Sequence, residues 1–92
     1  MIRGDLGSAI QNLLVYPNPS RDLFNISFNS EDIQDLSIRI INVIGAEVFR
    51  EDKQQFIGEY VKQITLENYD KGIYFLEIET ENGIINKKLI LQ

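Results

Sequence analysis

Residues 72–92 read GIYFLEIETENGIINKKLILQ, and this stretch decides the fold of the chain. Two runs rich in β-branched and aromatic residues flank the pair Asn82-Gly83, which readily takes the positive φ angles of a type I′ turn. The pattern therefore predicts a β-hairpin with Asn82 and Gly83 as its two-residue loop. In that register Leu76 would lie opposite Leu89, so that apolar side chains pair across the two strands.

The first strand of this hairpin has two different faces. Tyr74, Leu76 and Ile78 point to one side, whereas Ile73 and Phe75 point to the other. Two interpretations of Ile73 and Phe75 remain open. Either a loop or a neighbouring strand covers them, or this end of the sheet is a docking surface for another protein. The sequence favours the first interpretation, because large exposed apolar patches are uncommon on soluble monomers.

Length and composition restrict the classes of protein to which the chain belongs. The 92 residues suit one domain with one core. They include no cysteine and no histidine, which excludes disulfides, thiol nucleophiles, the commonest zinc ligands and the usual general base. The serines therefore lack a partner that would activate them. We expect no enzymatic activity, no catalytic residue, no metal and no cofactor.

The net charge of -5 also restricts the partners. A negative domain is repelled by phosphate backbones and by anionic lipid, so we expect no nucleic-acid partner. No apolar run approaches the roughly 18 residues that span a bilayer, so we expect no membrane insertion by this chain. Residues 1–11 lack the continuous apolar stretch of a secretory signal.

The periodicity of the apolar residues predicts strands throughout and no helix longer than one turn. Residues 1–12 have no sustained period, so we interpret them as a linker and residues 13–92 as the domain. The polar segments 29–35 and 52–58 are interpreted as connections between strands. Glu31, Asp32 and Asp35 in the first of these invite a calcium site, but they lack the spacing that wraps a chain around the ion.

About seven short strands, at spacings of about eight to twelve residues, predict an all-β chain folded as an antiparallel β-sandwich. These strands begin at Leu13, Leu23, Leu36, Glu47, Glu59, Gly72 and Ile84. The run from Asp70 to Leu76 resembles the Asp-x-Gly-x-Tyr-x-Cys run of immunoglobulin domains, with Leu76 in the place of the cysteine. The resemblance implies an immunoglobulin-like sandwich in which the hydroxyl of Tyr74 turns back onto upstream backbone.

The segment Pro17-Asn18-Pro19 holds both prolines of the chain. Each proline removes a backbone donor and fixes φ, and Pro19 also restricts Asn18 to extended angles. The segment therefore cannot continue a strand ladder and must turn stiffly. From the residues alone, it is a rigid connection between two strands.

Four short motifs together resemble the C-terminal sorting domain of the bacterial type IX secretion system, found on exported proteins of the Bacteroidetes. The resemblance spans residues 13–92, and its order and spacing make it specific. The motifs are Pro17-Asn18-Pro19, Asn42-Val43-Ile44-Gly45, Gly72-Ile73-Tyr74 and Lys88-Leu89-Ile90-Leu91-Gln92.

The resemblance implies a sorting domain carried at the end of a larger cargo protein. The folded domain would be recognised by the outer-membrane translocon, so that the cargo passes through the periplasm to the cell surface or the medium. In many members a surface sortase then cuts the linker before the domain and attaches the cargo to lipopolysaccharide; residues 1–12 would correspond to that linker. The implied sorting residues, together with the turn residue Gly83, are Pro17, Asn18, Pro19, Gly45, Gly72, Tyr74, Lys88, Leu89, Ile90, Leu91 and Gln92.

We interpret the end of the last strand, residues 88–92, as the part that the export machinery recognises. Ile73 and Phe75 lie beside it in the predicted hairpin, and recognition would use strand-edge and pocket contacts. A competing hypothesis is an autonomous immunoglobulin-like module for adhesion or carbohydrate binding on a secreted protein. That module would need exposed aromatic side chains on a concave sheet face, whereas the aromatic residues here mostly alternate inward.

Overall fold

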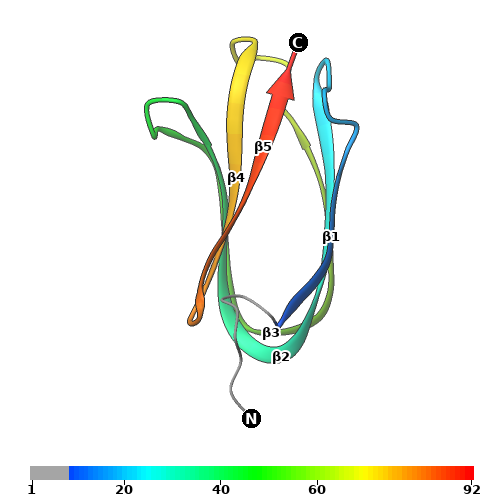
Figure 1. Ribbon diagram of the computed structural model, residues 1–92, viewed down its shortest axis with the longest axis vertical. Helices are drawn as coiled ribbons and strands as arrows, with labels where there is room; N and C mark the ends of the chain where they lie inside the picture. The colour runs from blue at the N-terminus through cyan, green and yellow to red at the C-terminus, as the bar shows by residue number, and fades with distance from the viewer. Residues whose placement is uncertain (1–8) are drawn as a thin grey trace.

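The computed structural model describes residues 9–92, which form five strands of one antiparallel sheet (Figure 1). Along the chain these strands are β1 (Ile10–Tyr16), β2 (Leu23–Asn42), β3 (Glu47–Thr65), β4 (Gly72–Thr80) and β5 (Gly83–Leu91). Strand β2 pairs with β3 along one edge, and with β1 and then β4 along the other edge. Strand β5 pairs with β4. Most of the predicted linker, residues 1–8, lies outside the described residues.

The all-β prediction is confirmed, but the predicted number of about seven strands is wrong. Strand β2 continues through residues 29–35, and β3 continues through residues 52–58, so two pairs of predicted strands are each one strand. Polar composition suggested loops there. The ladder nevertheless continues, because Gln34 still lies opposite Phe56, with register shifts on both sides of this pair.

The two long strands bend together in this region, so that the sheet curls over itself (Figure 1). On β3, Gln55 and Gly58 have positive φ angles of 50° and 97°, which suit glycine far better than other residues. On β2, Ser30 and Gln34 are buried, and the Gln34 side-chain amide donates a hydrogen bond to the Ser30 hydroxyl at 2.9 Å. The buried polar side chains of Ser30 and Gln34 therefore form a hydrogen bond with each other inside the bend.

The core lies between the two halves of the curled sheet. Alternate residues of β2 and β4 point inward and are buried, as strand geometry requires, and residues in or next to β3 and β5 complete the core. The largest of these side chains are Phe24, Phe28, Ile26, Ile38, Ile40, Leu66, Leu76, Ile78, Leu89 and Leu91. Near the bend, Phe28 stacks on Tyr60 with 4.8 Å between the ring centroids, and Phe56 meets both rings edge-on.

The predicted C-terminal hairpin exists, but its predicted register is wrong by two residues. Thr80 lies opposite Gly83, so the loop is Glu81-Asn82, and Leu89 lies opposite Tyr74. A shift by two keeps every side chain on its predicted face, so the hydrophobic pattern does not distinguish the two registers. The turn itself favours the observed one, because the Asn82 N–H donates to the Thr80 hydroxyl at 3.0 Å.

The first strand begins at Ile10, three residues before the predicted position Leu13. Asn12 has a positive φ of 59°, and the register with β2 shifts between Gln11 and Leu14. This irregularity breaks the alternation of apolar and polar residues, which hid the start of the strand in the sequence. Across residues 9–92, the structure contains no helix of the length and apolarity that crossing a membrane requires.

Candidate functional site

Four segments that are far apart in the sequence meet at one end of the molecule (Figure 1). We call this the motif end, and it consists of residues 17–20, 42–46, 70–74 and 88–92. Asn42 pairs with Tyr74 across β2 and β4, and Gly72 pairs with Leu91 across β4 and β5. The structure thus brings together the sequence-predicted sorting residues other than Gly83. That glycine lies at the far end of the β4–β5 hairpin.

The segment 17–20, which we call the strap, lies against the outer edge of β5. The Asn18 side-chain amide donates to the backbone oxygen of Lys88 at 2.8 Å. In the other direction, the Ile90 N–H donates to the Asn18 side-chain oxygen at 3.0 Å. One side-chain amide therefore makes the pair of hydrogen bonds that a neighbouring strand would make.

Ser20 completes this pairing with its backbone. Its N–H donates to the Ile90 oxygen at 2.9 Å, and its oxygen accepts the Gln92 N–H at 2.8 Å. Ser20 itself is buried, and its hydroxyl donates to the backbone oxygen of Leu23. The strap thus occupies the outward backbone groups of residues 88–92, so the edge that we expected a partner to pair with is already covered.

The side chains of residues 88–92 divide into two sets. Leu89 and Leu91 are fully buried and belong to the core. Lys88 and Gln92 are exposed, and Ile90 is half-buried beside them. Any partner that contacts this strand in its observed position therefore meets Lys88, Ile90 and Gln92, whereas the two leucines hold the strand in place.

The corner before β4 is fixed by Tyr74. Its hydroxyl donates to the backbone oxygen of Asp70 at 2.6 Å, which confirms the predicted return of the tyrosine onto upstream backbone. Burial, and then the neighbouring Asp70 carboxylate, raise the pKa of the Tyr74 phenol above its usual value, because both disfavour a phenolate. The group therefore stays a donor at neutral pH.

The turn between β2 and β3 is fixed by Asn42. Its side-chain oxygen accepts the N–H groups of Ile44 at 3.1 Å and Ala46 at 2.9 Å. The Gly45 N–H donates to the Asn42 backbone oxygen at 3.0 Å, and Gly45 has a φ of 86°, a region that other residues rarely adopt. The turn consequently has one well-defined conformation, and Gly45 is needed for it.

The predicted docking patch of Ile73 and Phe75 lies on the outer face of β4. Ile73 is 41% exposed and Phe75 is half-buried. A shallow cavity of about 380 Å³ opens over the same face, lined by Ile41, Phe75, Glu77, Asn86 and Lys88. The face is therefore accessible, and the docking of another protein on it stays a prediction.

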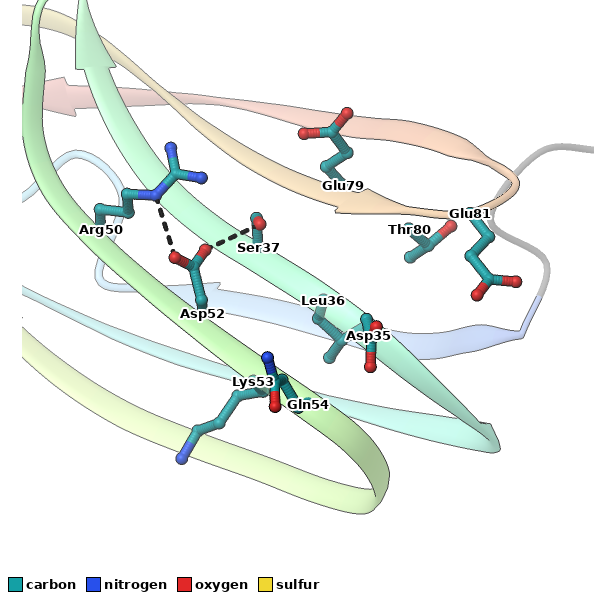
Figure 2. A pocket seen from close by; sticks show the side chains of 10 residues that line it. All are labelled: Asp35, Leu36, Ser37, Arg50, Asp52, Lys53, Gln54, Glu79, Thr80 and Glu81. Atoms are coloured by element: carbon teal, nitrogen blue, oxygen red, sulfur yellow. Dashed lines mark hydrogen bonds and ion pairs between the residues drawn. The ribbon is translucent and has the colours of Figure 1, made fainter.

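A polar pocket of about 410 Å³ lies towards the opposite end of the molecule, near the bend (Figure 2). Ser37 donates to one Asp52 carboxylate oxygen at 2.8 Å and Arg50 to the other at 3.3 Å. These two bonds lower the pKa of Asp52. Asp35, which also lines the pocket, accepts the Gln55 N–H at 2.9 Å and so supports the bend.

This pocket offers no arrangement for metal-dependent chemistry. Among residues 9–92, no three His, Cys, Asp or Glu side chains are placed to hold a metal ion. The nearby ionisable groups instead form ion pairs between neighbouring strands of the sheet. Arg39 bridges two strands by donating to Glu77 at 2.8 Å and to Glu47 at 3.0 Å, and this contact lowers the pKa of Glu47.

Sequence reasoning missed two parts of the motif end. Ser20 follows the second proline and was not singled out, although its backbone holds the end of β5. Val43 and Ile44 were quoted only as part of a motif, although they are 69% and 85% exposed. The available signal was two β-branched residues between Asn42 and Gly45, in turn positions that usually carry polar side chains.

Comparison with known proteins adds one finding. The family model described as "Secretion system C-terminal sorting domain" matches residues 14–92. No curated protein matches the chain. The matched range begins within β1 and includes all four segments of the motif end.

Proposed function

The chain belongs to the family of secretion system C-terminal sorting domains, and from this membership we propose that the type IX machinery recognises the motif end of the folded domain. The family function is a sorting signal for type IX secretion, carried as a tail on a cargo protein. It is not an enzymatic function, and it does not favour the adhesion-module alternative. The single observation that carries the proposal is the convergence of the four motif segments at one end.

We assign two roles to the predicted sorting residues. Asn18, Gly45, Tyr74, Leu89 and Leu91 build the motif end, because they fix its turns and hold β5. Pro17, Pro19 and Gly72 lie in the same segments and are assigned to the same role. Lys88, Ile90 and Gln92 are accessible and contact the partner, together with Ile73 and Phe75. Contact through side chains replaces the edge pairing that we expected from the sequence, because the strap occupies that edge. Gly83 pairs with Thr80 next to the loop of the β4–β5 hairpin at the far end, and we assign it to that turn.

The partner in this proposal is the outer-membrane translocon, which takes the cargo from the periplasm to the cell surface or the medium. A surface sortase then acts on the part of the linker that precedes β1. We also interpret the two halves of the curled sheet as an immunoglobulin-like sandwich. The tyrosine corner at Tyr74 supports this interpretation, since such domains carry the same contact.

The experiment is a secretion assay with a fluorescent reporter fused behind a signal peptide and in front of residues 1–92, in a host with a type IX system. The unchanged domain should deliver the reporter to the surface or the medium. Removal of residues 88–92 should leave the reporter in the periplasm. A matched control exchanges Ile84 for Thr in the same strand at the far end, where the side chain is 48% exposed, and should leave delivery unchanged. Delivery of the truncated form at the unchanged level would refute the proposal.

A further inference from the structure

The turn at residues 42–46 carries two aliphatic side chains into solvent. Val43 and Ile44 occupy its central positions and are 69% and 85% exposed. Exposed turn positions usually carry polar residues or glycine, and β-branched residues gain nothing from the turn conformation. The Asn42 side chain nevertheless holds the turn rigidly through its bonds to Ile44 and Ala46. The sequence thus fixes the backbone at a position where the side chains do not contribute to the core.

A cleft of about 260 Å³ opens between this turn and the corner before β4. Val43 and Ile44 line one wall, and Lys71 and Ile73 line the other. Both walls are held in place, the first by the Asn42 side chain and the second by the hydrogen bond from Tyr74 to the Asp70 backbone oxygen. The volume suits one large apolar side chain, which would meet aliphatic groups on two sides without any rearrangement of the domain.

The chain that precedes the domain enters at the opposite end. Ala9 is held next to the bend, where its oxygen accepts the Glu31 N–H at 2.9 Å, and the longest dimension of the molecule is 43 Å. Figure 1 shows the start of β1 at the bend and the 42–46 turn near the other end. The first described residues therefore lie far from the cleft and do not cover it.

We propose that this cleft receives an aliphatic or aromatic side chain from a protein of the type IX machinery, with Ile44 as the anchor on the domain. The inference rests on the proposed function and names the chemistry of its partner. A lipid surface fits less well, because the domain carries a net charge of -5 and Asp70 lies in the cleft wall. A second copy of the domain carries the same charge and is repelled likewise.

The first test uses the reporter fusion with matched exposed isoleucines at the two ends. Ile44→Asn should reduce delivery about tenfold or more, as expected for the loss of a buried anchor. Ile44→Met should restore most of it, because an apolar side chain of similar size remains. Ile33→Asn, at a position 65% exposed in the bend, should leave delivery within about twofold, since surface substitutions away from an interface have small effects. Equal thermal midpoints of all three variants would show that the fold is intact.

The second test replaces Ile44 or Ile33 by a photo-crosslinking amino acid in the same fusion. Position 44 should crosslink to a component of the type IX machinery that mass spectrometry identifies, and position 33 should not. Crosslinks from position 44 only to lipid, only to a second copy, or to the same proteins as position 33 would each overturn the inference. So would normal delivery of Ile44→Asn. If the unchanged domain fails to deliver the reporter, the proposed function itself fails, and this outcome is distinct from the others.

Discussion

The two ends of the molecule use polar groups in opposite ways. At the bend, Ser30 and Gln34 are buried and bond to each other, so polarity there serves packing. At the motif end, Asn18 and Asn42 remain at the surface and bond to backbone, so polarity there fixes turns and a strand edge. The bend therefore holds the two halves of the sheet together, whereas the motif end forms a rigid surface for recognition.

The edge of β5 makes the same contrast within one strand. On its outer side, residues 88–92 are covered by the strap. Residues 84–87 pair with β4 on the inner side but have no strand on the outer side among residues 9–92, since β5 is the last strand in the sheet order. An uncovered edge can pair with other chains. The strap therefore prevents residues 88–92 from pairing with another strand. Recognition there uses the exposed side chains of these residues and not their backbone.

We expect the largest effect from a comparison of protein stability after substitution at the two ends of β5. Leu89→Ala should lower the free energy of unfolding by about 2–5 kcal/mol, because it leaves a cavity in a fully packed core. Ile84→Ala should change it by only about 0.5 kcal/mol, because that side chain is half in solvent. Urea unfolding of the two purified variants measures both values. Equal losses would contradict the anchoring role that we assign to Leu89.

The strap should give the next largest effect. Asn18→Ala removes two hydrogen bonds, which at about 0.5–1.5 kcal/mol each predicts a loss of about 1–3 kcal/mol in unfolding free energy. It should also speed hydrogen exchange of the Ile90 amide. Asn18→Asp is the matched control, because its carboxylate still accepts from Ile90 but cannot donate to Lys88. An Ile90 amide that stays equally protected in Asn18→Ala would show that the strap does not hold the edge.

Alkaline pH should lower the free energy of unfolding, and one tyrosine at each end of the molecule should contribute to this loss. Burial raises the pKa of Tyr60 near the bend and of Tyr74 at the motif end, and a hydrogen bond to Glu51 raises that of Tyr60 further. Below about pH 10 the phenols are neutral in both the folded and the unfolded chain, so their contribution to stability is complete. This contribution is lost as pH rises above about 10, because the two phenols then ionise readily in the unfolded chain but not in the folded chain.

Unfolding curves measured between neutral pH and strongly alkaline pH check this expectation. Tyr60→Phe should remove the part of the decline that belongs to the bend, and Tyr74→Phe should remove the part that belongs to the motif end. The two variants are each other's control. A decline that persists unchanged in both variants would assign the alkaline loss to other groups.

The smallest effect is expected from the ion pairs on the outer face of the sheet. Arg39 lowers the pKa of Glu47, so this contact contributes stability above the ordinary pKa of a glutamate and loses it as pH falls. Arg39→Gln should therefore cause a small loss at neutral pH that shrinks in acid and in high salt, since these groups are exposed. Thermal midpoints at two salt concentrations test this. A salt-independent loss would indicate a packing role of Arg39 instead.

The sequence alone predicted the strand content and the inward faces, because both depend on local pattern, and the resemblance of residues 70–76 to immunoglobulin domains implied the tyrosine corner. The local pattern failed where polar residues continue a strand. Residues 29–35 look like a loop, but the ladder with β3 continues through the pair of Gln34 and Phe56, and the contact between Ser30 and Gln34 supports it. The hydrophobic pattern also could not determine the register of the β4–β5 hairpin, because a shift by two residues leaves every side chain on the same face.

For the recognition surface, the sequence supplied the residues but not their arrangement. Four short motifs were visible, yet nothing in their spacing indicated that Asn18 would bond to β5 across 70 residues of chain. Two β-branched residues in the turn at Val43 and Ile44 were also visible, but the sequence did not show that they would face the corner before β4 across a cleft. Such non-local contacts depend on how the sheet curls, which the bend determines.

The most direct test of the account compares delivery of the reporter by two double variants. Ile44→Asn with Ile73→Asn alters the motif end, and Ile33→Asn with Ile57→Asn alters the bend end, at positions that are all at least 41% exposed. We expect the first variant to lose delivery about tenfold or more and the second to stay near the unchanged level, with both variants folded. Equal delivery by the two folded variants would contradict the claim that the motif end is the surface that the machinery recognises.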